Sequence, residues 1–133
     1  MIKNILILAG GKGKRLGNLT KKTPKPLLKF NNHVFLDYII NNLLTLKTKK
    51  IYILCCYKSF QFFELYHNKI LNKTKIICIK EPRHLGTGGS LNYSKKLIQN
   101  NTLICNGDTY INYDFKNLKK LQLNKKNIVI GCI

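Results

Sequence analysis

Short apolar runs alternate with amphipathic stretches along this chain. The runs are rich in Ile, Leu and Val and apolar at consecutive positions, so both faces of each are expected to be buried, as in parallel strands packed between helices. We expect strands at residues 2–8, 51–55, 75–79, 102–105 and 127–133.

The segments between these runs carry helical spacing. Apolar residues recur at three- and four-residue intervals through residues 34–44, and a second stripe of this kind spans residues 63–70. We expect a third, less periodic helix from about residue 88 to 100 and a fourth from 114 to 123, with Asp114 favourable at its N-terminus. Alternation of strand and helix predicts an α/β fold with a Rossmann-like, mostly parallel sheet and helices on both faces.

The length of the chain suits one folded domain. It has 133 residues, of which 44% are hydrophobic, and we place the domain at residues 1–133. The chain stops at Gly131-Cys132-Ile133, inside or just after the last expected strand and with no helix behind it. Either this strand is the edge of the sheet, or further strands are missing from the chain.

The net charge of +19, from 24 Lys and Arg against 5 Asp and Glu, favours anionic partners: nucleic acids, anionic lipids or phosphorylated metabolites. Lys, Asn and Ile together supply 55 of the 133 residues, and all three have codons built from A and T alone. An A/T-rich genome explains this composition better than a binding function does. Because the cations are almost all lysine and lie in every segment, nucleic acid is the weaker hypothesis.

The N-terminus predicts a cytoplasmic protein with no membrane attachment. Its apolar run covers only residues 5–9, too short for a signal peptide or a bilayer span. The five cysteines are odd in number, include an adjacent pair and contain no C-x-x-C, so neither a disulfide framework nor a zinc ribbon fits. We expect inert thiols.

The first expected strand leads into a glycine-rich loop at residues 8–17, Leu-Ala-Gly-Gly-Lys-Gly-Lys-Arg-Leu-Gly. Ligands of open α/β sheets bind beyond the carboxyl ends of the strands, where glycine amides can approach phosphate oxygens closely. The spacing is neither the dinucleotide fingerprint nor a Walker A loop. Asp108 follows the fourth apolar run across Asn106-Gly107, so we expect its carboxylate at the same edge of the sheet.

The loop and three further segments resemble the sugar-1-phosphate nucleotidylyltransferases. The family opens with L-A-G-G-x-G-x-R-L followed by P-K-P, which matches residues 8–16 and 24–26. Residues 35–38, 81–91 and 106–108 match its later segments in the same order. Within the family the resemblance is greatest to the guanylyltransferases that act on D-glycero-D-manno-heptose 1-phosphate, followed by those that act on mannose 1-phosphate.

The resemblance implies a reaction and a set of ligands. A sugar phosphate oxygen attacks the α-phosphorus of a nucleoside triphosphate, GTP above all, which gives an NDP-sugar and pyrophosphate for lipopolysaccharide or capsule synthesis. Magnesium is the implied cofactor and Asp108 its ligand, since Mg²⁺ takes one or two protein carboxylates and fills its shell with phosphates and water.

Site residues follow from the same resemblance. Arg15 and Lys25 are the implied catalytic residues: Arg15 would hold the departing pyrophosphate, and Lys25, between two prolines, would present its ammonium near the α-phosphate. We expect the side chains of Lys12 and Lys14 to be solvated and give His33, His67 and His84 surface or packing roles. The implied nucleotide contacts are Leu8, Ala9, Gly10, Gly11, Lys12, Gly13, Glu81, Gly86, Thr87 and Gly88.

Members of the family continue well past the length of this chain, with further strands, a lysine for the sugar phosphate and a second metal-binding aspartate. The resemblance therefore implies that the C-terminal strands are missing here, and that the apolar run at 127–133 needs a cover, from a homo-oligomer or a complementing chain. Three hypotheses stay open: a working transferase, a nucleotide-binding remnant without catalysis, and a basic nucleic-acid-binding domain.

Overall fold

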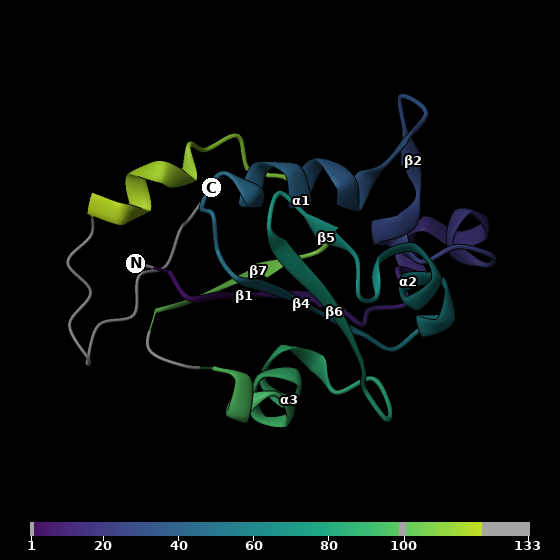
Figure 1. Ribbon diagram of the computed structural model, residues 1–133. Helices are drawn as coiled ribbons and strands as arrows, with labels where there is room; N and C mark the ends of the chain where they lie inside the picture. The colour runs from purple at the N-terminus through teal and green to yellow at the C-terminus, as the bar shows by residue number, and fades with distance from the viewer. Residues whose placement is uncertain (1, 99–100, 121–133) are drawn as a thin grey trace.

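The structure is a computed structural model that describes residues 2–98 and 101–120. Within these residues a five-stranded sheet forms the centre of the molecule, with helices on both faces (Figure 1). Its strands are β1 (Asn4–Ala9), β4 (Lys50–Cys55), β5 (Ile70–Leu71), β6 (Thr74–Lys80) and β7 (Thr102–Asn106).

The strand order of the sheet is β5-β6-β4-β1-β7. Strands β6, β4, β1 and β7 are parallel, and only the short β5 runs antiparallel, to β6. The chain thus builds outward from β1 through β4 to β6 and then returns to the other side of β1 with β7. In open α/β sheets, ligands bind outside the carboxyl ends of the strands where the order reverses. Here that point lies between β1 and β7.

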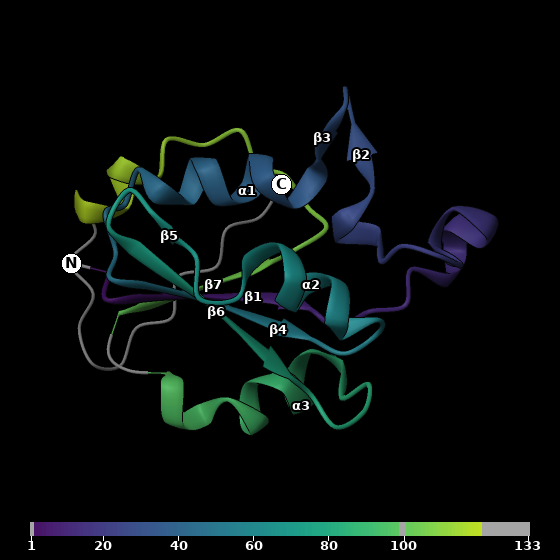
Figure 2. The same cartoon turned by 45° about the vertical axis from the view of Figure 1, so that its right-hand side comes forward.

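Each face of the sheet has its own hydrophobic core. Helix α1 (Phe35–Leu44) buries Leu36, Ile40 and Leu43, one stripe at helical spacing, and α2 (Ser59–Tyr66) packs on the same face of the sheet (Figure 2). Helix α3 (Gly86–Tyr93) covers the opposite face, where Leu6 and Leu54 form a second core. Burial on both faces explains why these strands are continuously apolar.

The expected α/β fold with a mostly parallel sheet is confirmed. The four expected strands within the described residues agree with β1, β4, β6 and β7 to within two residues at each end. The strand expected at 127–133 lies outside the described residues.

The expected second helix is wrong in its last part. Helix α2 ends at Tyr66, and Ile70 lies exposed in β5. Asn68 takes a positive φ of 63°, and Asn72 and Lys73, with φ of 46° and 68°, form the tight turn between β5 and β6. A two-residue hairpin turn of this kind needs positive φ at both positions, so turn geometry overrides the apolar spacing here.

The expected third and fourth helices differ from the structure in length and type. Helix α3 starts at Gly86, two residues early, and ends at Tyr93, followed by a 3₁₀ turn, η3 (Lys95–Leu97). The fourth segment is the 3₁₀ helix η4 (Phe115–Lys120), and the Asp114 carboxylate accepts a hydrogen bond from the Lys116 amide at 3.0 Å. Four short elements were not expected at all: η1 (Lys14–Thr20), η2 (Lys25–Leu27) and the hairpin of β2 (Lys29–Phe30) and β3 (His33–Val34).

Two cysteines sit inside the sheet as packing residues. Burial raises the pKa of the Cys55 and Cys78 thiols to about 12. Their sulfurs donate to the carbonyls of Ile79 and Phe62. A thiol protonated at neutral pH is a poor nucleophile, which agrees with the expectation of inert thiols. Across the described residues, no helix combines the length and the apolar character needed to cross a membrane.

Candidate active site

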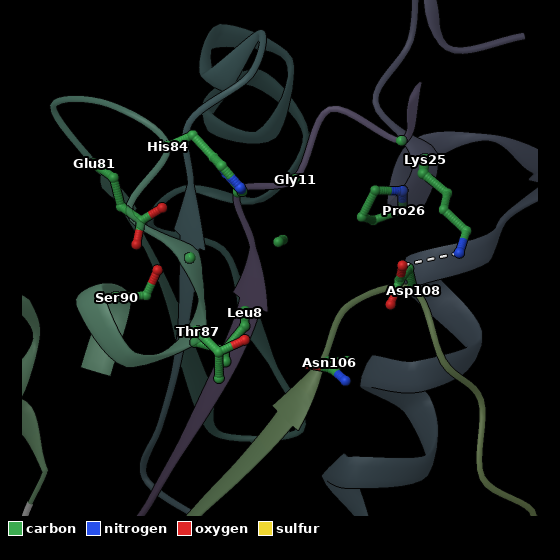
Figure 3. A pocket seen from close by; sticks show the side chains of 14 residues that line it. Leu8, Gly11, Lys25, Pro26, Glu81, His84, Thr87, Ser90, Asn106 and Asp108 are labelled. Carbon is green, nitrogen blue, oxygen red and sulfur yellow. Dashed lines mark hydrogen bonds and ion pairs between the residues drawn. The ribbon is translucent and has the colours of Figure 1, made fainter. Parts of the chain in front are cut away.

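A cavity of about 320 Å³ opens at the carboxyl ends of β1 and β7, where the strand order reverses (Figure 3). Its walls come from four segments: the end of β1 with the loop after it, the start of η2, the β6–α3 connection with the first part of α3, and the end of β7 with the turn after it. Most of the residues that the sequence predicts for the site line this cavity: Leu8, Ala9, Gly10, Gly11, Gly13, Lys25, Glu81, Gly86, Thr87 and Asp108.

Lys25 and Asp108 are in contact at one wall of the cavity (Figure 3). The Lys25 Nζ atom lies 2.9 Å from Asp108 Oδ2, although the two residues are 83 positions apart in the sequence. The side chains are 40% and 39% exposed, so both are open to a ligand. The prolines on either side of Lys25 fix the backbone from which its side chain projects.

The turn that carries Asp108 lies directly against the glycine-rich loop. The Gly107 amide donates to the Leu8 carbonyl at 2.8 Å, and a Cβ at Gly107 would lie 3.1 Å from the Ala9 side chain and 3.2 Å from that of Ile7. Only glycine fits such a close approach without displacing its neighbours. The parallel pairing of β1 with β7 therefore brings Asp108 to the glycine-rich loop.

Glu81 is a buried carboxylate at the far end of the cavity. It is 1% exposed, and its Oε1 atom has no hydrogen-bond partner within the described residues. Its amide donates to the Cys55 carbonyl at 2.8 Å, which fixes its place beside β4. A side chain at Gly10 would collide with Glu81 Oε2, so the glycine leaves room for the carboxylate. A buried unpaired acceptor is costly to keep, and a ligand that donates hydrogen bonds would satisfy it.

Three predicted residues do not line the cavity. Arg15 is exposed on the 3₁₀ helix η1, outside the cavity. This helix begins after Gly13, which lines the cavity in a left-handed conformation (φ 62°, ψ 33°). Lys12 is also exposed, as expected for its side chain, and Gly88 lies on α3 with open space around it. A phosphate contact from Arg15 stays a prediction.

The family is decided by a comparison with protein-family models. The model described as nucleotidyl transferase matches residues 4–133. The chain belongs to this family. The resemblance found in the sequence is thereby confirmed, and so is its implication of an enzymatic family.

Curated relatives of this chain include two D-glycero-α-D-manno-heptose 1-phosphate guanylyltransferases. The one from Campylobacter jejuni is 35% identical over 127 residues, which cover 95% of this chain and 55% of the relative. The one from Aneurinibacillus thermoaerophilus is 30% identical over 122 residues, 91% of this chain and 53% of the relative. The chain thus spans about half the length of these relatives.

Solved structures agree with the fold. HddC from Yersinia pseudotuberculosis, complexed with GMP-PN, aligns with a TM-score of 0.76 at 28% identity, over 90% of this chain and 53% of that one. UDP-glucose pyrophosphorylase from Acinetobacter baumannii aligns with a TM-score of 0.72 at 14% identity, over 81% of this chain and 46% of that one. The second likeness supports the fold alone.

Sequence reasoning missed four residues that line the cavity: Pro26, His84, Ser90 and Asn106. Two of them had a signal. Ser90 lies four positions after Gly86 on α3, hence on the same helix face, and Asn106 ends the strand that leads to Asp108. His84 had none besides its place between Glu81 and Gly86; it is an exposed residue at the wall of the cavity, and the expected surface or packing role stays a prediction.

Proposed function

We propose that this chain forms the nucleotide-binding part of a sugar-1-phosphate guanylyltransferase, which joins GTP to a heptose- or mannose-type sugar 1-phosphate and releases pyrophosphate. The observation that carries the proposal is the meeting of Lys25 and Asp108 beside the glycine-rich loop. The names of the two heptose 1-phosphate relatives support the choice of substrates. We further propose that the reaction takes place in the cytoplasm and supplies surface polysaccharide synthesis.

The cavity suits a reaction between two anions. An oxygen of the sugar phosphate forms a bond to the α-phosphorus, and the bond from this phosphorus to the oxygen bridging the β-phosphate breaks, so pyrophosphate leaves. Such transfer needs positive charge and fixed hydrogen-bond donors more than it needs a nucleophilic side chain. Backbone amides near Gly11 and Gly13 would bind phosphate oxygens, and the Lys25 ammonium would offset charge at the α-phosphate.

Asp108 fits a magnesium ion that is bound jointly with the nucleotide. Among the described residues, no three or more His, Cys, Asp and Glu side chains form a group that could hold a metal ion. One carboxylate with phosphate oxygens completing the shell is a common arrangement for Mg²⁺. When bound, Mg²⁺ neutralises charge on the phosphates. Asp108 would be its protein ligand, at the same wall of the cavity as Lys25.

The base preference rests on Glu81. An ionised carboxylate only accepts hydrogen bonds, and guanine is the base that presents two adjacent donors, N1–H and the N2 amino group, on one edge. The unpartnered Oε1 of Glu81 and its burial support guanine as the base that this nucleotidyl transferase binds. Neither uracil nor adenine offers two such donors side by side.

Replacing Glu81 with glutamine should lower kcat/KM for GTP about 100-fold, because the amide exchanges one acceptor for a donor that faces the guanine donors. Glutamine keeps the length of the side chain beside Gly10, so the melting temperature should stay near that of the wild type. The measurement is kcat/KM for GTP and UTP with each protein. A Glu81→Gln protein that still prefers GTP by the wild-type margin would show that another group selects the base.

The test of the proposed function is pyrophosphate release by the purified chain with Mg²⁺, each of the four common nucleoside triphosphates, and mannose or heptose 1-phosphate. Release that requires GTP and the sugar phosphate is the expected result. If GTP raises the melting temperature but no pyrophosphate appears, the chain binds nucleotide without catalysis. If GTP does neither, and nucleic acid binds in a salt-dependent way, the proposal is rejected.

A further inference from the structure

The hydroxyl group of one buried residue, Thr20, hydrogen-bonds to the glycine-rich loop. Thr20 ends η1, is 4% exposed and does not line the cavity. Its Oγ1 atom lies 3.1 Å from the Gly13 carbonyl oxygen and 3.3 Å from that of Gly17, and it donates to this pair. One side chain thereby closes the turn that follows the phosphate-binding glycines.

This contact sets the direction of a backbone amide. The Gly13 carbonyl and the Lys14 N–H belong to one planar trans peptide, so they point in opposite directions. Because the carbonyl is bound by Thr20 on one side, the Lys14 N–H is directed away from Thr20. The Leu16 amide also donates to the Gly13 carbonyl, at 3.0 Å, which reinforces this orientation.

Gly13 itself is confined between two side chains. A Cβ at Gly13 would lie 3.0 Å from the Thr20 methyl group and 3.1 Å from the Lys25 Cβ. Gly13 of the loop is therefore tightly packed against Thr20 and Lys25 at the wall of the cavity. A substitution at Thr20 would therefore alter the packing around Gly13 and Lys25, which line the cavity.

The segment that carries Thr20 is anchored by hydrogen bonds from the turn after β4 and from α2. Tyr57, in the turn after β4, donates its hydroxyl to the carbonyls of Thr20 at 2.9 Å and Lys21 at 3.0 Å. Gln61, on α2, donates to the Lys22 carbonyl at 2.8 Å. These bonds leave the segment that carries Thr20 little freedom relative to β4 and α2.

We propose that Thr20 is a positioning residue for polyphosphate: its hydroxyl orients the peptide between Gly13 and Lys14 so that the loop amides are ready for phosphate oxygens, and Tyr57 holds Thr20 in place. The inference rests on the proposed function, since the ligand of the loop is the triphosphate of GTP. Pre-orientation of donors strengthens binding because no ordering remains to be done when the ligand arrives.

The test compares Thr20→Val with Thr20→Ser in calorimetric titrations with MgGTP. Valine keeps the shape and loses the hydroxyl, so the Kd should rise about tenfold, the effect of weakening one charge-assisted hydrogen bond. Serine keeps the hydroxyl and loses the methyl group that contacts Gly13, so its Kd should stay within about threefold of the wild type. A residue that acted by packing alone would give the reverse order.

Tyr57→Phe is the second variant, because it removes a hydroxyl that is outside the cavity and leaves the ring in place. We expect a Kd for MgGTP about threefold above that of the wild type, with an unchanged melting temperature. If Thr20→Val folds and binds MgGTP like the wild type, the inference is wrong while the proposed function stands. If Thr20→Val does not fold, an unchanged Kd of Tyr57→Phe overturns the inference. A wild-type chain that binds no MgGTP rejects the proposed function, and the inference with it.

Discussion

Asp108→Asn should reduce the rate of pyrophosphate release about 1,000-fold and remove the magnesium-dependent part of GTP binding. Asparagine has the shape of aspartate but no charge, so it is a poor ligand for a hard cation. The substitution should not disturb the fold, because the side chain is 39% exposed and its ion pair is with Lys25 at the cavity wall. Turnover, the Kd for GTP with and without Mg²⁺, and the melting temperature are the three measurements.

The matched control for this variant is Asp114→Asn. Asp114 is also an exposed aspartate of the segment after β7, but it caps η4 and lies outside the cavity. We expect its turnover to equal that of the wild type, apart from a small loss of stability at the cap. Comparable activity of Asp108→Asn and Asp114→Asn would remove Asp108 from the metal site.

Lys25→Gln should lower kcat about 100-fold, while the KM for GTP changes much less. The reason is that, in the proposed reaction, the ammonium would offset charge that grows at the α-phosphate as the two anions meet, whereas the loop amides and Glu81 would bind the nucleotide before reaction. The same substitution should have a second effect, on metal binding, which is favourable. Without its 2.9 Å partner, Asp108 no longer interacts with a competing cation, so metal binding in the presence of GTP should become tighter.

The control is Lys29→Gln, which removes a lysine that is exposed on β2 and does not line the cavity. It corrects for the loss of one positive charge from a chain of net charge +19. A parallel loss of activity in both variants would mean that general attraction of anions, and not the position of Lys25, accounts for the effect.

Much of the fold could be predicted from the sequence because the signals were local. Runs such as residues 51–55 are apolar on both faces, which is what a central parallel strand requires. Local sequence patterns gave the wrong element where the backbone conformation of single residues determines the structure. The apolar stripe continues past Tyr66 to Ile70, yet the positive φ of Asn68 and the turn at 72–73 place Ile70 in a strand.

The candidate site was predictable only in part. The glycine-rich loop and Asp108 could be placed at one edge of the sheet, since parallel strands end there together. That the Lys25 ammonium and the Asp108 carboxylate are in contact depends on packing between segments 83 positions apart. The direction of Arg15 depends on the left-handed Gly13, and the part played by Thr20 depends on hydrogen bonds to carbonyls that no residue pattern encodes.

The place of β1 between β4 and β7 also determines when the cavity can form during synthesis of the protein. Asn4 aligns with Lys50 on one side but with Thr102 on the other, so one edge of the central strand stays unpaired until the ribosome has released β7. The cavity is completed by this long-range pairing, which is slow to form in comparison with local contacts. On the proposed function, nucleotide in the cell would therefore meet no finished pocket on the nascent chain, and its binding would stabilise only molecules in which β7 has joined the sheet.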